Sequence, residues 1–88
     1  MVGLNYTIES ADGPLPLGTG VVVLVNGATC KVNADPVNAG RFNVEFPASG
    51  PTTVAVLVNG LQPLVYNDTI PDAGGEAATR NPMVLLPL

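Results

Sequence analysis

Residues that could carry out chemistry are few in this 88-residue chain. It has no histidine and a single cysteine, Cys30, and its serines, Ser10 and Ser49, stand beside turn-forming residues. A serine or cysteine nucleophile needs a base next to it, most often a histidine. The sequence therefore predicts a protein that is not an enzyme, with no catalytic residues, no cofactor and no small-molecule substrate. Cys30 is expected to be a small, half-buried strand residue.

The most polar loop, PDAGGEAATRNP at residues 71–82, places Asp72 and Glu76 on either side of Gly74 and Gly75. Calcium takes six to eight oxygen ligands, more than two carboxylates and nearby carbonyls offer. A phosphate-binding glycine loop normally opens a helix, and no helical pattern follows this one. We expect a solvated connection without a bound metal.

The charge of the chain limits the kinds of molecule that it is expected to bind. The formal net charge is −4, and only three basic residues oppose seven carboxylates. They do not form the basic stripe that nucleic acid or anionic lipid would need. No apolar run approaches the roughly 20 residues of a membrane span. The first residues, MVGLNYTIES, lack the basic start of a signal peptide. The sequence thus predicts a soluble protein made in a cytoplasm, with protein subunits as partners, no nucleic acid and no membrane insertion.

The positions of the strands follow from a repeated phrase, VVVLVNG at Val21–Gly27 and VAVLVNG at Val54–Gly60. Asn-Gly tolerates the positive φ angles of a two-residue type I′ turn. Each phrase therefore predicts a β-hairpin, one joining residues 20–25 to 28–33 and the other joining 52–58 to 61–66. Pro63 lies within the last of these strands, which is accordingly expected at a sheet edge or at a bulge.

Alternation defines further strands. In RFNVEF the apolar Phe42, Val44 and Phe46 alternate with polar residues, which predicts one buried and one solvated face. LNYTIE near the start and MVLLP near the end complete seven strands, and the nine prolines leave little room for helices. The predicted fold is all-β: a single domain over residues 1–88, built as a seven-stranded antiparallel two-sheet sandwich of the immunoglobulin-like kind.

Turn and core residues between about residues 11 and 64 resemble the carboxypeptidase-regulatory-like, or transthyretin-like, sandwich family. The residues that carry the resemblance are Asp12, Gly13, Pro14, Leu15, Gly18, Asp35, Gly40, Phe42, Gly50 and Gly60. The resemblance implies the sandwich fold, in its prealbumin-like form. It also implies a role of the kind most members have, as non-catalytic accessory, surface or assembly modules.

Apolar residues exceed what one face of each strand needs. In a two-layer domain, Val22, Leu24, Ala55 and Leu57 would point outward. Residues 83–88 form a candidate docking strand or tail, separable from the sandwich. The residues predicted to bind a partner are therefore Val22, Leu24, Ala55, Leu57, Met83, Val84, Leu85 and Leu86. The alternative is that residues 67–82 fold back over a sheet and cover the outward set.

These features predict a structural module that docks on a larger protein lattice or self-associates. Its most concrete form is a capsid decoration or stabilising protein of a virus of the phage type, located in the virion. The alternative is a module of a surface or adhesion protein that recognises carbohydrate or peptide.

Overall fold

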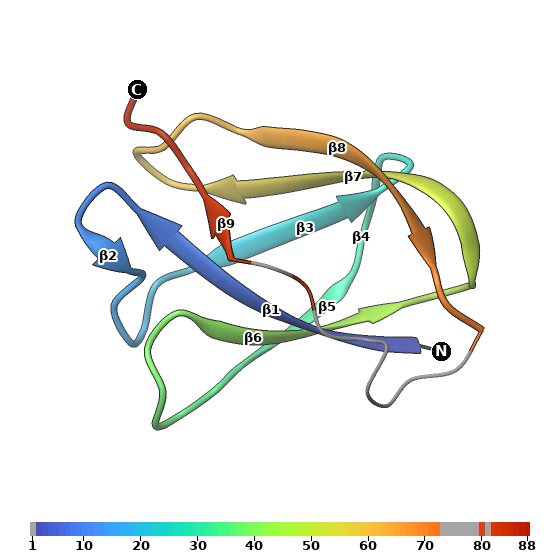
Figure 1. Ribbon diagram of the computed structural model, residues 1–88, viewed down its shortest axis with the longest axis horizontal. Coiled ribbons are helices and arrows are strands. Elements are labelled where there is room, and N and C mark those ends of the chain that lie inside the picture. Colours follow the sequence, from blue (N-terminus) through green and yellow to red (C-terminus); the bar gives the residue numbers. More distant parts are fainter. Residues whose placement is uncertain (1, 73–79, 81) are drawn as a thin grey trace.

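The computed structural model describes residues 2–72, 80 and 82–88. Within these residues the chain forms strands and no helix (Figure 1), so the predicted all-β class is confirmed. The strands, in chain order, are β1 (Val2–Ser10), β2 (Gly13–Pro14), β3 (Val21–Val25), β4 (Ala28–Thr29), β5 (Lys31–Ala34), β6 (Arg41–Phe46), β7 (Gly50–Val58), β8 (Leu64–Ile70) and β9 (Met83–Val84).

The strands form two sheets. One has the order β2-β1-β6-β5, with β9 paired to β1, and the other has the order β4-β3-β7-β8. Neighbours are antiparallel except β9, which runs parallel to β1. Buried side chains from both sheets form one core cluster. The fold is therefore a β-sandwich.

Each of the seven predicted strand segments contains strand residues, but their bounds and number differ from the prediction. The third segment is divided at Cys30 into β4, which pairs with β3, and β5, which pairs with β6 in the other sheet. The chain thus changes sheets at Cys30. The two-residue strand β2 was not predicted, because it is an extension of the turn after β1 and carries no alternating pattern.

The two Asn-Gly pairs form different turns. Asn26 and Gly27 both have positive φ, 49° and 85°, as a type I′ turn requires, so this prediction is confirmed. At the second pair only Gly60 has a positive φ, 86°, and Leu61 N donates to Val58 O. That combination is typical of a type II turn. The prediction of a two-residue hairpin there is wrong, because β8 begins only at Leu64.

Replacing Gly27 tests the first turn. A side chain at φ 85° costs roughly 1–2 kcal/mol, so Gly27→Ala is expected to lower the free energy of unfolding by about that amount. Gly20→Ala is the matched control: a Cβ at either position meets nothing within 4 Å, but Gly20 has no positive φ. Denaturant unfolding followed by circular dichroism measures both variants. Equal stabilities would contradict the type I′ assignment.

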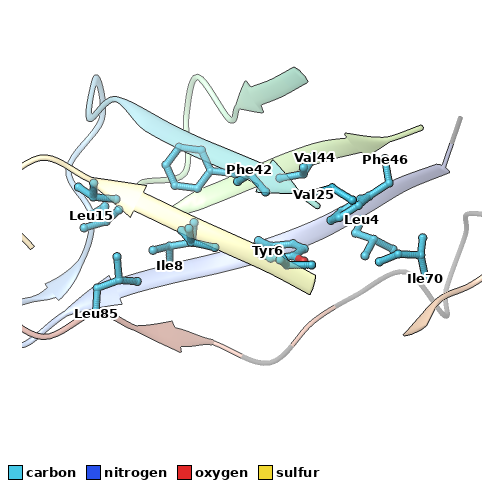
Figure 2. Packing of buried hydrophobic residues seen from close by; sticks show 14 of the residues in the cluster. Leu4, Tyr6, Ile8, Leu15, Val25, Phe42, Val44, Phe46, Ile70 and Leu85 are labelled. Atoms are coloured by element: carbon cyan, nitrogen blue, oxygen red, sulfur yellow. The ribbon is translucent and has the colours of Figure 1, made fainter. Parts of the chain in front are cut away.

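The core follows the predicted alternation. Phe42, Val44 and Phe46 are buried, whereas Arg41 and the other alternate residues of β6 face outward. From β1, the core receives Val2, Leu4, Tyr6 and Ile8. Figure 2 shows Leu15, Ile8 and Leu85 toward one end of this core and Leu4, Phe46 and Ile70 toward the other.

The C-terminal segment closes the sandwich along the edge of β1. β9 lies beside the C-terminal half of β1 (Figure 1), where Ile8 and Glu9 pair with Met83 and Val84. Leu85 N donates to Glu9 O, 2.8 Å away, and the Leu85 side chain is 1% exposed. The last residues then reach the other sheet's β7–β8 connection, where Leu86 O and Pro87 O accept hydrogen bonds from Gln62. The tail is therefore joined to the domain's own sheets.

Arg80 also links the two sheets. Its backbone N donates to Asn5 O of β1 at 2.9 Å. Its side-chain Nε donates to Asp68 Oδ2 of β8 at 2.9 Å, and Nη2 donates to Thr69 O at 3.4 Å. This contact holds the edge of β8 close to β1.

Candidate interaction surface

Two outward rows of apolar side chains cross the sheet of β3, β7 and β8. Val22 of β3 lies opposite Leu57 of β7. In the next row, Leu24 of β3 lies opposite Ala55 of β7, which is itself opposite Val65 of β8. Directly opposed residues point to the same side of a sheet, and the alternate residues of these strands are buried in the core or face it. The five side chains therefore share one outer surface, called the apolar face below.

The apolar face is open to solvent at its two sides. Val22 is 45% exposed and Val65 is 61% exposed, while Leu24, Ala55 and Leu57 are half-buried. Single exposed valines are ordinary on monomers, but a contiguous apolar patch across three strands commonly marks a contact surface. The structure brings together the four strand residues that the sequence assigns to an interface. Their binding role stays a prediction.

The outward positions of β3, β7 and β8 carry no charged side chain. Beyond the apolar face, the same surface continues into a polar end, where Thr53 Oγ1 and Asn67 Oδ1 are 3.0 Å apart and Thr53 N donates to Asn26 Oδ1. An apolar centre beside a polar margin is the usual anatomy of a protein interface. Asp68 lines the hollow at the polar end, so charge lies beside the apolar face and outside its outward strand positions.

Val65 was missed by sequence reasoning. Alternation could have identified it: Val65 stands between Leu64 and Tyr66, which face the core, so its own side chain points outward. The predicted two-residue hairpin gave the wrong register, so it could not place Val65 beside Ala55. The observed pairing Ala55↔Val65 arises from the longer connection between β7 and β8.

The tail residues assigned to a partner surface divide into two kinds. Met83 is half-buried, whereas Val84 and Leu86 are 50% and 59% exposed. Leu85 is a core residue, and its assignment to a partner surface is corrected: the side chain is enclosed by its own domain. The sequence could not show this, because the parallel pairing of β9 with β1 joins segments about seventy-five positions apart.

The alternative prediction was that residues 67–82 fold back over the sheet and cover the outward residues. The described part of this segment does not do so. Residues 67–70 complete β8 within its own sheet, and Arg80 lies at the edge beside β1. Asp72 is described and exposed. Gly74, Gly75 and Glu76, the centre of the predicted solvated connection, lie outside the described residues.

The residues that the sequence offers for chemistry are not arranged as a reactive site in the described part of the chain. Ser10 Oγ accepts a hydrogen bond from Asp12 N at the turn after β1. Cys30 is half-buried, as expected, but it lies between β4 and β5 and not within a strand. Burial raises the pKa of its thiol, which disfavours the reactive thiolate. Among residues 2–72, 80 and 82–88, no group of three or more His, Cys, Asp or Glu side chains is placed to hold a metal ion. The same residues include no helix long and apolar enough to cross a membrane.

A polar contact joins the two sheets inside the sandwich. The hydroxyls of Tyr6 in β1 and Tyr66 in β8 are hydrogen-bonded at 2.5 Å. Burial raises the pKa of both phenols, and at Tyr66 the hydrogen bond with Tyr6 raises it further. The folded state therefore favours the neutral form of both side chains.

Alkaline pH is expected to unfold the protein as the tyrosines ionise. A phenol whose folded pKa is raised contributes stability that is fully present below its unfolded pKa of 10.0 and is lost as the pH rises above that value. These are the chain's only tyrosines, so tyrosinate absorbance reports on this pair alone. We expect the absorbance to appear together with the loss of β-sheet circular dichroism. Tyrosinate formation near pH 10 with an intact fold would contradict the buried pair.

The chain matches no protein-family model, and no curated protein matches it.

Proposed function

We propose that the protein is a non-catalytic structural module of the immunoglobulin-like or prealbumin-like sandwich type, which assembles with other protein subunits through the apolar face. The observation that supports this most is the contiguous outward set of Val22, Leu24, Ala55, Leu57 and Val65 on strands whose outward positions carry no charge. The most concrete form of the proposal is a phage-type capsid decoration or stabilising protein.

For the isolated chain, the proposed occupant of the apolar face is a second copy of the chain. With a net charge of −4, two copies repel each other weakly at long range, so they would meet most readily where both surfaces are uncharged. Ala55 is smaller than the Leu24 and Val65 that flank it across the sheet. Two such surfaces related by a two-fold axis would be self-complementary, with a large side chain of one copy over Ala55 of the other. A site on a larger lattice would use the same surface.

Light scattering after size-exclusion chromatography tests the proposal. The wild-type chain is expected to approach twice its mass of 8.9 kDa as concentration rises. Val65→Lys is expected to remain a monomer, because an interface would have to bury the added ammonium group without a partner. The position is 61% exposed, so the substitution should leave the fold intact.

Val37→Lys is the matched control. Val37 is 78% exposed, more than Val65, but lies in the turn between β5 and β6, away from the apolar face. It should associate as the wild type does. Equal loss of association in both variants, or a wild-type chain that stays monomeric at high concentration, would contradict assembly through the apolar face.

A further inference from the structure

The outer face of the other sheet is polar and hollowed. Its central feature is a row of three asparagines on neighbouring strands: Asn5 of β1 lies opposite Asn43 of β6, which lies opposite Asn33 of β5. Adjacent strands are about 4.8 Å apart, so the row spans roughly 10 Å. The row lines a hollow of about 610 Å³ that is bounded by Thr7, Asp35 and Arg41. We call these three amides the asparagine row.

Some donors and acceptors of the asparagine row are not used within the protein. Asn43 Nδ2 donates to Asn5 Oδ1 at 2.9 Å, and Asn33 Nδ2 donates to Glu45 Oε2 at 2.9 Å. These bonds fix the orientation of the amides. Among the described residues, Asn5 Nδ2, Asn43 Oδ1 and Asn33 Oδ1 have no protein partner. Asn5 Nδ2 thus offers two N–H donors, Asn43 Nδ2 and Asn33 Nδ2 each keep a second N–H, and the two free carbonyl oxygens accept.

Gly3 leaves room for this arrangement. A Cβ at Gly3 would come within 3.2 Å of both Nδ2 and Oδ1 of Asn43. That is closer than ordinary van der Waals contact, so a larger residue would press on the central amide of the row. A glycine inside a strand often marks such a close approach.

Hydrogen bonds hold one wall of the hollow in place. Asp35 Oδ1 accepts hydrogen bonds from Val37 N and Asn38 N at 2.8 and 2.9 Å, and Oδ2 accepts from Asn38 Nδ2 at 3.2 Å. These bonds, led by the one from the Asn38 backbone, lower the pKa of Asp35. Asp35 N donates to Arg41 O at 2.9 Å, which ties this wall to β6. A site on such a frame needs little ordering when it binds.

The charges around the hollow are balanced. Lys31 Nζ lies 3.8 Å from Glu45 Oε2, and the positive charge of Arg41 acts on Asp35. A ligand with a net charge would gain little here. Mixed donors and acceptors without net charge suit hydroxyl groups, each of which donates and accepts.

We propose that the asparagine row binds a neutral carbohydrate, with sugar hydroxyls donating to Asn43 and Asn33 and accepting from Asn5. Tyr6 and Phe42 turn their rings into the core, so ring stacking contributes little. Affinity should accordingly be weak, with a Kd on the order of 1 mM. The site is on the opposite outer face from the apolar face, so a subunit held through its apolar face would still present the asparagine row to solvent.

Titration of the ¹⁵N-labelled chain with cellobiose, maltose and N,N′-diacetylchitobiose, followed by NMR, tests this site. At least one of the three is expected to shift the side-chain amide signals of the asparagine row saturably. Asn33→Ala and Asn43→Ala should each weaken that binding by roughly tenfold, the effect of about one lost hydrogen bond. Asn33 is exposed, so its variant should fold even if Asn43→Ala does not. Asn67→Ala, on the outer face of the other sheet, is the matched control and should bind as the wild type does.

Several results would overturn the proposal: no saturable shift with any of the three sugars, shifts that map away from the row, or equal weakening in Asn67→Ala. Stronger shifts with an extended glycine-serine peptide than with any sugar would assign the hollow to peptide binding instead. Val65→Lys should still bind the sugar. The site is thereby tested independently of assembly through the apolar face.

Discussion

Deleting Met83–Leu88 is expected to destabilise the sandwich by about 4–8 kcal/mol, most of what a domain of this size possesses. The Leu85 side chain is 1% exposed, and its loss uncovers the core cluster into which it packs. The deletion also removes the hydrogen bonds that Glu9 and Gln62 make with the tail. Denaturant unfolding followed by circular dichroism measures the loss.

Single substitutions separate the contribution of Leu85 packing from the other contributions of the tail to stability. Leu85→Ala is expected to cost about 2–5 kcal/mol, whereas Val84→Ala, at a neighbouring position that is 50% exposed, should cost less than about 1 kcal/mol. If the truncated chain and Leu85→Ala both unfold at the wild-type midpoint, residues 83–88 are the separable docking tail that the sequence suggests, and the core assignment of Leu85 is wrong.

The second large loss of stability is expected for Phe46→Ala. Phe46 is fully buried, and its ring stacks on that of Tyr6 with centroids 6.3 Å apart. Truncation should lower the free energy of unfolding by about 3–5 kcal/mol. The adjacent Glu45→Ala is the control: Glu45 faces outward and makes a 3.8 Å ion pair with the exposed Lys31, which contributes about 0–1 kcal/mol. Similar costs for the two variants would mean that the faces of β6 are exchanged.

Local patterns predicted the parts of the fold that local physics determines. The alternation of Phe42, Val44 and Phe46 identified the buried face of β6, because successive strand residues point to opposite sides. Asn26-Gly27 predicted its own turn, because the positive φ angles are a property of those two residues. The outward placement of Val22 and Leu57 also followed from alternation.

Features that depend on distant contacts were not predictable in this way. The second Asn-Gly pair has the same sequence as the first, yet its turn differs: Leu61 bridges Pro87, and the β7–β8 pairing starts from Val56 and Leu64. Leu85 is in the core because β9 pairs with β1. Similarly, the sequence around each of the three asparagines of the row does not show that they lie opposite one another. That follows from the pairing of β1 with β6 and of β6 with β5.

The two outer surfaces differ in chemistry. The sheet of β3, β7 and β8 presents an uncharged apolar centre, whereas the sheet of β1, β6 and β5 presents amides and balanced charges. In the proposed assembly, the first surface is covered by another subunit and the second remains in water. A small domain could then serve both as a structural contact and as a displayed polar surface.

The measurement that tests the central claim most directly is NMR of the ¹⁵N- and methyl-labelled chain over a dilution series from about 1 mM to about 10 µM, a range that brackets weak to moderate self-association. Assembly through the apolar face predicts concentration-dependent shifts at the methyl groups of Val22, Leu24, Ala55, Leu57 and Val65, with the asparagine row unchanged. Spectra independent of concentration, or shifts confined to β1, β6 and β5, would contradict it.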